Sequence, residues 1–271
     1  MSLVRLNRSL IRLSGERVVN FLQGLVTQDV VAGQAAGARS MGSLFLNPKG
    51  RVISESLISF GTDSVLLDVP ETNSEMIASM LTRHKLRLAI KIEKCEDLFV
   101  CADLESSNDP RSPEMPGRKY VGKEEVVDGD EKRYRKLRIL AGVAEGSGEI
   151  PKDSIVPIFY NFDLLNCISF TKGCYTGQEL VTRTLRRGIV RKRLFPITGE
   201  VRAGDSVCYK GEKIGELIVA EGGVGLAQLS LPSNYGLNDV AQIRETLKAI
   251  DMDQFSVGSD RVNLVVPHYM R

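Results

Sequence analysis

The hydrophobic pattern of the chain changes at Gly188, and this change constrains the fold more than any other feature. Before that residue, segments with helical spacing alternate with short β-rich runs. After it, short β-rich runs separated by glycine turns dominate, with one helical pattern at 237–249 and a last strand pattern at 261–267. The sequence therefore predicts a mixed α+β fold that ends in a small β-barrel or sheet.

Upstream of Gly188, the patterns predict discrete elements. We expect a helix over residues 15–30 capped by Ser14, a β-hairpin over 44–54, an amphipathic helix over 72–84, paired strands over 86–93 and 97–103, and a short helix from 134. Residues 103–131 are polar, Pro-rich and charged. That composition predicts a long mobile loop or insertion.

The N-terminus allows two interpretations. Arginines occupy positions 5, 8 and 12 before the first acidic residue, Glu16. Organelle transit peptides have a similar composition, whereas the apolar positions of residues 6–13 fit an opening strand. We favour the strand, which implies that any import signal has been removed or was never present.

The overall composition argues against several classes of protein. A net charge of +2 gives no general attraction to nucleic acid or membranes, and no run of about 18 apolar residues could span a bilayer. The five cysteines include no C-x-x-C pair, so reduced thiols in the cytosol or mitochondrial matrix fit better than a disulfide framework. Two histidines argue against a zinc site completed within one chain.

One cysteine lies in a distinctive setting, the stretch TKGCYTGQELVTRT at 171–184. Thr176 and Glu179 have the spacing of a capping box, which predicts a helix that starts at Gly177. Cys174 would then lie near the positive end of the helix dipole and close to Lys172, conditions that favour a thiolate. A buried, inert cysteine is the alternative, and residue chemistry alone leaves both open.

The same region is strongly basic. Residues 172–193 hold seven basic side chains against Glu179 alone, a local charge of +6. This charge predicts an anion site for a carboxylate-bearing ligand, an acidic protein partner or RNA, unless it is only a solvated helix face. RNA is the weakest candidate, because Tyr175 is the only aromatic residue among these charges before Phe195.

The string KGCYTGQE at 172–179 is similar to the signature of the YgfZ proteins, a branch of the aminomethyltransferase superfamily named for the folate-dependent T-protein of the glycine cleavage system. Further blocks resemble other family segments in the same order: FLQGLVTQDV (21–30), LFLNPKGRV (44–52), HKLRLAIKIE (84–93), GVGLAQL (223–229) and VVPHYM (265–270). The continuation TRTLRRGIVRKRLFPI (182–197) most resembles the mitochondrial iron–sulfur cluster assembly branch.

The resemblance implies a three-lobed GcvT/YgfZ-like ring around a folate-type cavity, with a ferredoxin-like middle portion and a small C-terminal β-barrel. On this model, residues 1–95 and 132–187 form the N-terminal and middle lobes of the folate-binding-like module. Residues 103–131 form a mobile loop, and residues 188–271 form the barrel domain.

The resemblance also implies a function in maturing proteins with four-iron (4Fe-4S) clusters. Cys174 would be the functional thiol and a ligand of a transient cluster shared with an A-type carrier protein, since a cluster normally needs four ligands. The site would extend to Lys172, Gly173, Tyr175, Gln178, Glu179, Arg183 and, in the hairpin, Arg51. We expect a monomer in the mitochondrial matrix, or in a bacterial-type cytoplasm, that meets carriers and client 4Fe-4S apoproteins but no nucleic acid or membrane span.

Two other functions compete with this one. A tetrahydrofolate-dependent aminomethyl or one-carbon transferase would use Glu55 as its acid–base group and Arg183, Arg186 or Arg187 for the folate carboxylates. However, Phe159 stands where the family usually has a glutamate, so we expect folate to bind poorly and classical aminomethyl transfer to be absent. The third candidate is an interaction protein whose cysteine is structural.

Overall fold

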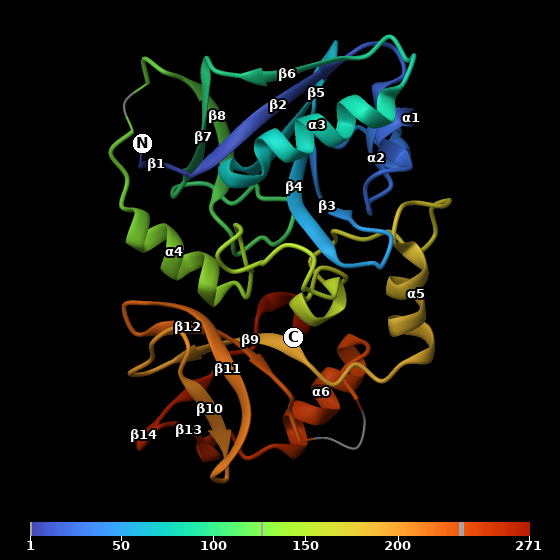
Figure 1. Cartoon of the computed structure of the whole chain (residues 1–271). Helices are drawn as coiled ribbons and strands as arrows, with labels where there is room; N and C mark the ends of the chain where they lie inside the picture. Colours follow the sequence, from blue (N-terminus) through green and yellow to red (C-terminus); the bar gives the residue numbers. More distant parts are fainter. Residues whose placement is uncertain (1, 126, 233–235) are drawn as a thin grey trace.

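The structure is a computed structural model that describes residues 2–125, 127–232 and 236–271. In these ranges the strands form three antiparallel sheets (Figure 1). The five-stranded sheet has the order β3 (Ser40–Leu46), β4 (Val52–Phe60), β5 (Ser64–Pro70), β2 (Arg8–Ser14) and β6 (Lys91–Cys95). The three-stranded sheet has the order β1 (Leu3–Arg5), β7 (Leu98–Asp103) and β8 (Gly117–Gly122).

The seven-stranded C-terminal sheet is a nearly closed, barrel-like unit at the bottom of Figure 1. Its order is β14 (Asp260–Arg261), β13 (Phe255–Val257), β10 (Ser206–Tyr209), β11 (Glu212–Glu221), β12 (Val224–Leu229), β9 (Arg193–Thr198) and β15 (Asn263–Leu264). The β-rich module expected after Gly188 is thus confirmed. The last expected strand is shorter than the pattern indicated, because only β14 and β15 form pairs there.

The helices that the structure describes are α1 (Val18–Gln23), α2 (Val30–Ala35), α3 (Ser74–Lys85), α4 (Glu131–Leu140), α5 (Gln178–Arg187) and α6 (Val240–Ala249). Short 3-10 helices lie at Glu71–Asn73, Pro157–Tyr160, Met252–Gln254 and His268–Met270. The opening strand, the hairpin over 44–54 and the helices expected near 72–84, 134 and 237–249 are confirmed. None of the helices in the described ranges combines the length and apolar content needed to cross a bilayer.

The single helix expected over residues 15–30 is wrong. The helix begins after Arg17 rather than at Ser14, and it stops at Gly24. A second helix starts after Asp29, whose carboxylate accepts a hydrogen bond from the N–H of Ala32. The backbone between the two helices instead accepts hydrogen bonds from the loop that precedes α5.

The pairing expected between residues 86–93 and 97–103 is also wrong. Leu86 ends α3 with a φ of +48°, and the strand begins only at Lys91. β6 pairs with β2 in the five-stranded sheet, whereas β7 pairs with β1 and β8. An alternating pattern marks a strand but does not choose its neighbour.

Residues 103–131 are not simply a loop. They contain β8, and the side chains of Asp109, Arg111 and Arg118 are buried in ion pairs with the body of the protein. These contacts fix the segment; Val126 lies outside the described residues.

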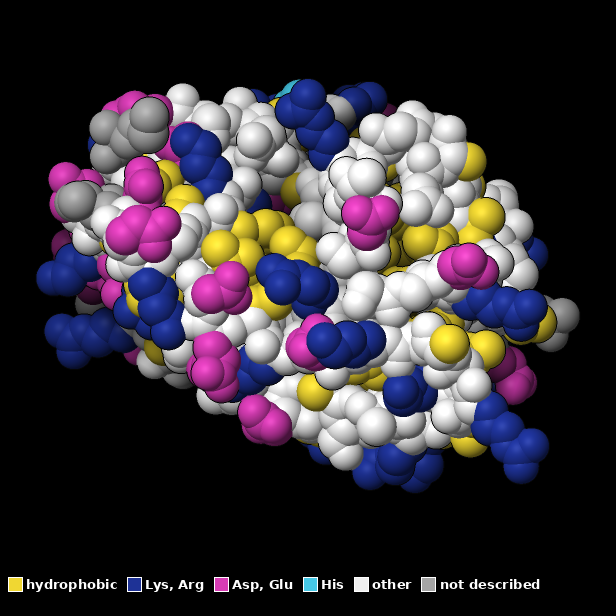
Figure 2. Space-filling view, turned by 90° about the horizontal axis from the view of Figure 1, so that it is seen from above, with side chains coloured by type: hydrophobic (Ala, Val, Ile, Leu, Met, Phe, Trp, Pro, Cys, Tyr) yellow, Lys and Arg dark blue, Asp and Glu magenta, His cyan; other side chains and the backbone are white. Residues whose placement is uncertain are grey.

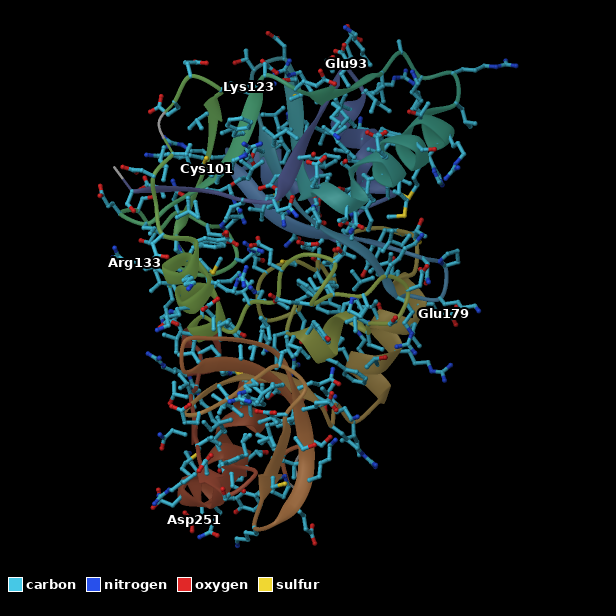
Figure 3. All side chains as sticks on the ribbon, turned by 60° about the vertical axis from the view of Figure 1, so that its left-hand side comes forward. Glu93, Cys101, Lys123, Arg133, Glu179 and Asp251 are labelled. Carbon is cyan, nitrogen blue, oxygen red and sulfur yellow. The ribbon has the colours of Figure 1, made fainter. Side chains whose placement is uncertain are left out.

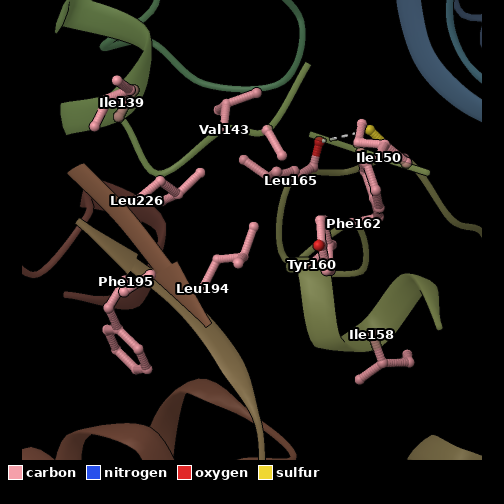
Figure 4. Packing of buried hydrophobic residues seen from close by; sticks show 14 of the residues in the cluster. Ile139, Val143, Ile150, Ile158, Tyr160, Phe162, Leu165, Leu194, Phe195 and Leu226 are labelled. Atoms are coloured by element: carbon pink, nitrogen blue, oxygen red, sulfur yellow. Dashed lines mark hydrogen bonds between the residues drawn. The ribbon is translucent and has the colours of Figure 1, made fainter. Parts of the chain in front are cut away.

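Two hydrophobic cores hold the molecule together. The smaller one lies between α1, α2, α3 and the five-stranded sheet. The larger one runs from Val4 to Met270, so the central segments and the barrel pack on one another (Figure 4). A domain boundary at residue 188 remains our proposal.

Candidate functional site

The loop before α5 is fixed by Lys172, which is buried. Its Nζ donates hydrogen bonds to the carbonyl oxygens of Gln23 at 2.6 Å, Val26 at 2.9 Å and Gln28 at 2.7 Å. These carbonyls belong to the last residue of α1 and to the connection between α1 and α2. Burial lowers the pKa of Lys172 to about 8. The lysine therefore ties the loop to the N-terminal helices.

Tyr175 provides the second anchor of this loop. Its ring is buried, and the Lys172 ammonium lies 5.3 Å from the ring centroid, within cation–π range. Burial raises the pKa of the Tyr175 hydroxyl to about 12, and that oxygen has no hydrogen-bond partner among the described residues. The next residue, Thr176, donates its backbone N–H to Gly24 O at 3.2 Å.

Between these anchors the chain presents Cys174 to solvent as a free thiol. Gly173 precedes it and is exposed as well. The buried residues on either side hold the exposed pair in a defined place. This arrangement suits a cysteine that reacts or ligates and does not suit one that packs.

The helix that follows begins within one residue of the predicted position, but its cap is different. Gly177 is the N-cap, with φ of +80°, and no side chain caps the helix, so the expected Thr176 capping box is wrong. A Cβ at Gly177 would lie 2.5 Å from the carbonyl oxygen of Asn47. Glycine is therefore required where the turn of the β3–β4 hairpin packs on the start of α5.

A pocket of about 580 Å³ lies beside Cys174 along the outer face of α5. Its lining residues are Cys174, Tyr175, Gln178, Glu179, Thr182, Arg183 and Arg186. The structure thus brings together five of the residues predicted for the cluster site with Arg186, which was named only for the folate alternative, and adds Thr182. Lys172, Gly173 and Arg51 are not among its lining residues, and the Arg187 side chain lies outside the described ones.

The remaining predicted residues lie elsewhere. Arg51 is half-buried and donates to the carbonyl oxygen of Ser154 at 3.3 Å. Glu55 is only 3% exposed, and its Oε1 accepts from Arg8 at 2.6 Å and from the backbone N–H of Gly146 at 3.0 Å. Phe159 is partly buried and packs against the larger core.

Glu55 belongs to a buried charge network that the sequence did not reveal. Glu145 is its centre, and its Oε1 accepts from Arg118 at 2.6 Å and from Arg111 at 3.1 Å. These arginines, followed by Arg8 and Arg138, hold the pKa of Glu145 well below its usual range against the opposing effect of burial. Arg8 also pairs with Asp68. The arginines of segment 103–131 thus fill the space beside the sheet.

The other cysteines differ from Cys174 in exposure. Cys95, Cys101 and Cys167 are buried, and Cys208 is half-buried. Burial raises the pKa of Cys167 to about 12. In the described part of the chain, no three histidine, cysteine or carboxylate side chains are placed to hold a metal ion.

No family model matches the chain, but individual relatives do. It is 31% identical over 268 residues to the human "iron-sulfur cluster assembly factor IBA57, mitochondrial", an alignment that covers 82% of this chain and 75% of that protein. The chain belongs to the IBA57 family.

Fungal IBA57 homologues, also named mitochondrial, agree with this assignment. Identity is 32% to the Aspergillus oryzae protein and 31% to that of Pyricularia oryzae, over 74% and 80% of this chain. The alignments span only 58% and 61% of those two relatives' own lengths.

A solved structure supports the fold of the IBA57 family. The glycine cleavage system aminomethyltransferase T from Bartonella henselae aligns with a TM-score of 0.63 over 100% of this chain and 86% of that one. Sequence identity is 13%, so the likeness concerns the fold alone. The fold predicted from the sequence, that of the aminomethyltransferase superfamily, is confirmed.

Proposed function

We propose that this chain is a mitochondrial-matrix iron–sulfur cluster assembly factor in which Cys174 ligates a cluster in transit. The observation that carries the proposal is the display of an exposed thiol between two buried anchors, Lys172 and Tyr175. The names of the IBA57 relatives support the process and the compartment.

The cluster is cargo, and Cys174 supplies one ligand. Cys167 precedes the same segment but is buried, so it does not share the surface of Cys174. Four ligands are the norm for such clusters, hence a second protein must supply the others. We propose an A-type carrier as that protein, with the motif residues Gln178, Glu179 and Arg183 lining the contact and the finished clusters passing to 4Fe-4S apoproteins.

The decisive experiment mixes the protein, as a monomer, with a cluster-loaded A-type carrier. Wild type should co-elute with the carrier in size-exclusion chromatography, and the visible spectrum of the complex should differ from that of the loaded carrier alone. The spectrum with Cys174→Ser should stay that of the carrier, because a serine hydroxyl is a poor ligand for iron.

Cys208→Ser is the matched control, since Cys208 lies in β10 and outside the pocket. It should behave as wild type. Full cluster transfer to a four-iron client by Cys174→Ser would contradict the assigned role.

Tetrahydrofolate-dependent transfer is the second candidate, favoured only by the fold likeness. The acidic group that this chemistry needs is not provided. The Glu55 carboxylate is buried and engaged by Arg8 and Gly146, and Phe159 offers no acid. We therefore expect calorimetry with tetrahydrofolate to give no saturable binding; micromolar binding that Glu55→Gln abolishes would reverse this choice.

A further inference from the structure

Four basic side chains around the end of α5 have no partner among the residues that the structure describes. Arg183 and Arg186 on the helix, and Arg191 and Lys192 after it, are exposed. None of them takes part in a described hydrogen bond or ion pair. By contrast, acidic and basic side chains are interspersed across the face seen from above in Figure 2. The surface at α5 thus carries uncompensated positive charge.

Among these cations, Ile189 is held out in solvent. It is 65% exposed, although both neighbours are fixed: Asn238 Nδ2 donates to Gly188 O at 2.8 Å, and Val190 N donates to Asn238 Oδ1 at 3.1 Å. A Cβ at Gly236 would lie 3.1 Å from Ile189 Cγ2. Ile189 therefore lies in a segment, residues 188–192, whose backbone is fixed by Asn238.

Arg193 fixes the C-terminal end of the segment 188–192. This side chain is fully buried, and its guanidinium makes two 2.8 Å hydrogen bonds to the carboxylate of Asp163. Its Nε donates to Leu237 O at 2.7 Å. Bidentate pairs of this kind fix geometry as well as charge.

Ile189 lies two residues beyond the end of α5, after an extended Gly188, at the opposite end of the helix from Cys174. The pocket residues Gln178, Thr182 and Arg186 follow one another at helical spacing between these two ends. The ten residues of α5 span about 15 Å. α5 lies at the edge of the molecule, with Glu179 on its outer side (Figures 1 and 3), so one partner could contact both ends.

We propose that α5 and residues 188–192 form a docking surface for an acidic protein with an apolar socket: the socket receives Ile189, and carboxylates around it pair with Arg183, Arg186, Arg191 and Lys192. The occupant is the cluster carrier, a point that rests on the proposed function. Charge steers the encounter and a buried apolar anchor holds it, as in other interfaces. Docking is thereby separate from ligation by Cys174.

The test measures binding of the cluster-free A-type carrier by fluorescence anisotropy. Ile189→Asp should weaken binding by at least about tenfold. Leu86→Asp is the matched control, because Leu86 is 83% exposed but lies between α3 and β6. The affinity of this variant for the carrier should stay within about twofold of that of wild type. Thermal melting by circular dichroism verifies that both variants fold.

A second arm tests the charge. Arg183→Glu with Arg186→Glu should weaken binding and flatten its dependence on salt between about 50 and 500 mM. Cys208→Ser, which changes a residue outside the pocket, should bind the cluster-free carrier as wild type does.

The outcomes separate the two proposals. Equal binding by wild type and Ile189→Asp overturns the docking surface and leaves the proposed function standing. If Ile189→Asp weakens binding but the wild-type complex never takes up a cluster, the proposed function is overturned and the docking surface is supported. Failure of wild type to bind the carrier, or binding to RNA or anionic vesicles in its place, overturns the surface.

Discussion

At the scale of single residues, the position of the Cys174 loop depends on Lys172. Its ammonium donates hydrogen bonds to three backbone carbonyl oxygens in the interior of the protein. Lys172→Met would leave those oxygens without a donor, at a cost of about 1–3 kcal/mol for a buried unsatisfied group. We expect urea unfolding to report a loss of this order. A loss below about 0.5 kcal/mol would mean that water replaces the ammonium.

The pKa of Lys172 gives this residue a pH signature. Because burial lowers the pKa to about 8 from 10.5, the unfolded chain binds more protons than the folded one between those values. The contribution of Lys172 to stability should therefore rise with pH across that window. The unfolding free energies of wild type and Lys172→Met, measured at several pH values, isolate this contribution. The free energy of wild type minus that of the variant should grow as the pH rises from about 8. A constant or shrinking difference would contradict the assignment.

At the scale of elements, the segment 103–131 is fixed by charge. The Arg118 side chain is buried and contacts Glu145 and Asp68. Because other arginines still pair with these carboxylates, Arg118→Met should cost about 1.5–3 kcal/mol, the contribution of a charge-assisted hydrogen bond. Its neighbour Lys119, with a side chain 39% exposed, pairs with Asp103, and Lys119→Met should cost less than about 1 kcal/mol. Urea unfolding compares the two; equal losses would show that the network does not stabilise the segment.

The sequence predicts the elements that depend on local patterns, but not the contacts between residues that are distant along the chain. The hairpin at 44–54, the helix at 72–84 and the start of α5 rest on local patterns, and these were found. The carbonyls that hold Lys172 lie 144–149 residues away, and the partners of Arg118 are also distant in sequence. Composition made segment 103–131 look mobile because polarity alone cannot distinguish a solvated charge from a paired, buried one.

At the scale of the whole molecule, the barrel and the segments before it share a core. That core includes residues from both sides of Gly188 (Figure 4). The buried Asp163–Arg193 ion pair crosses the same boundary. Separating the parts at residue 188 would expose this apolar surface and leave Arg193 without its carboxylate.

We therefore expect the full chain to unfold in one cooperative transition, seen alike by far-UV circular dichroism and tyrosine fluorescence. The fragment 1–187 alone should lack a cooperative melt, because part of its core has lost its cover. Asp163→Asn should lower the midpoint of the full chain without splitting the transition, since it weakens the pair but leaves the apolar contact in place. Two separate transitions in the wild-type chain would show that the boundary divides independent domains, and Cys174 and Ile189 would then lie on a hinge rather than on one rigid surface.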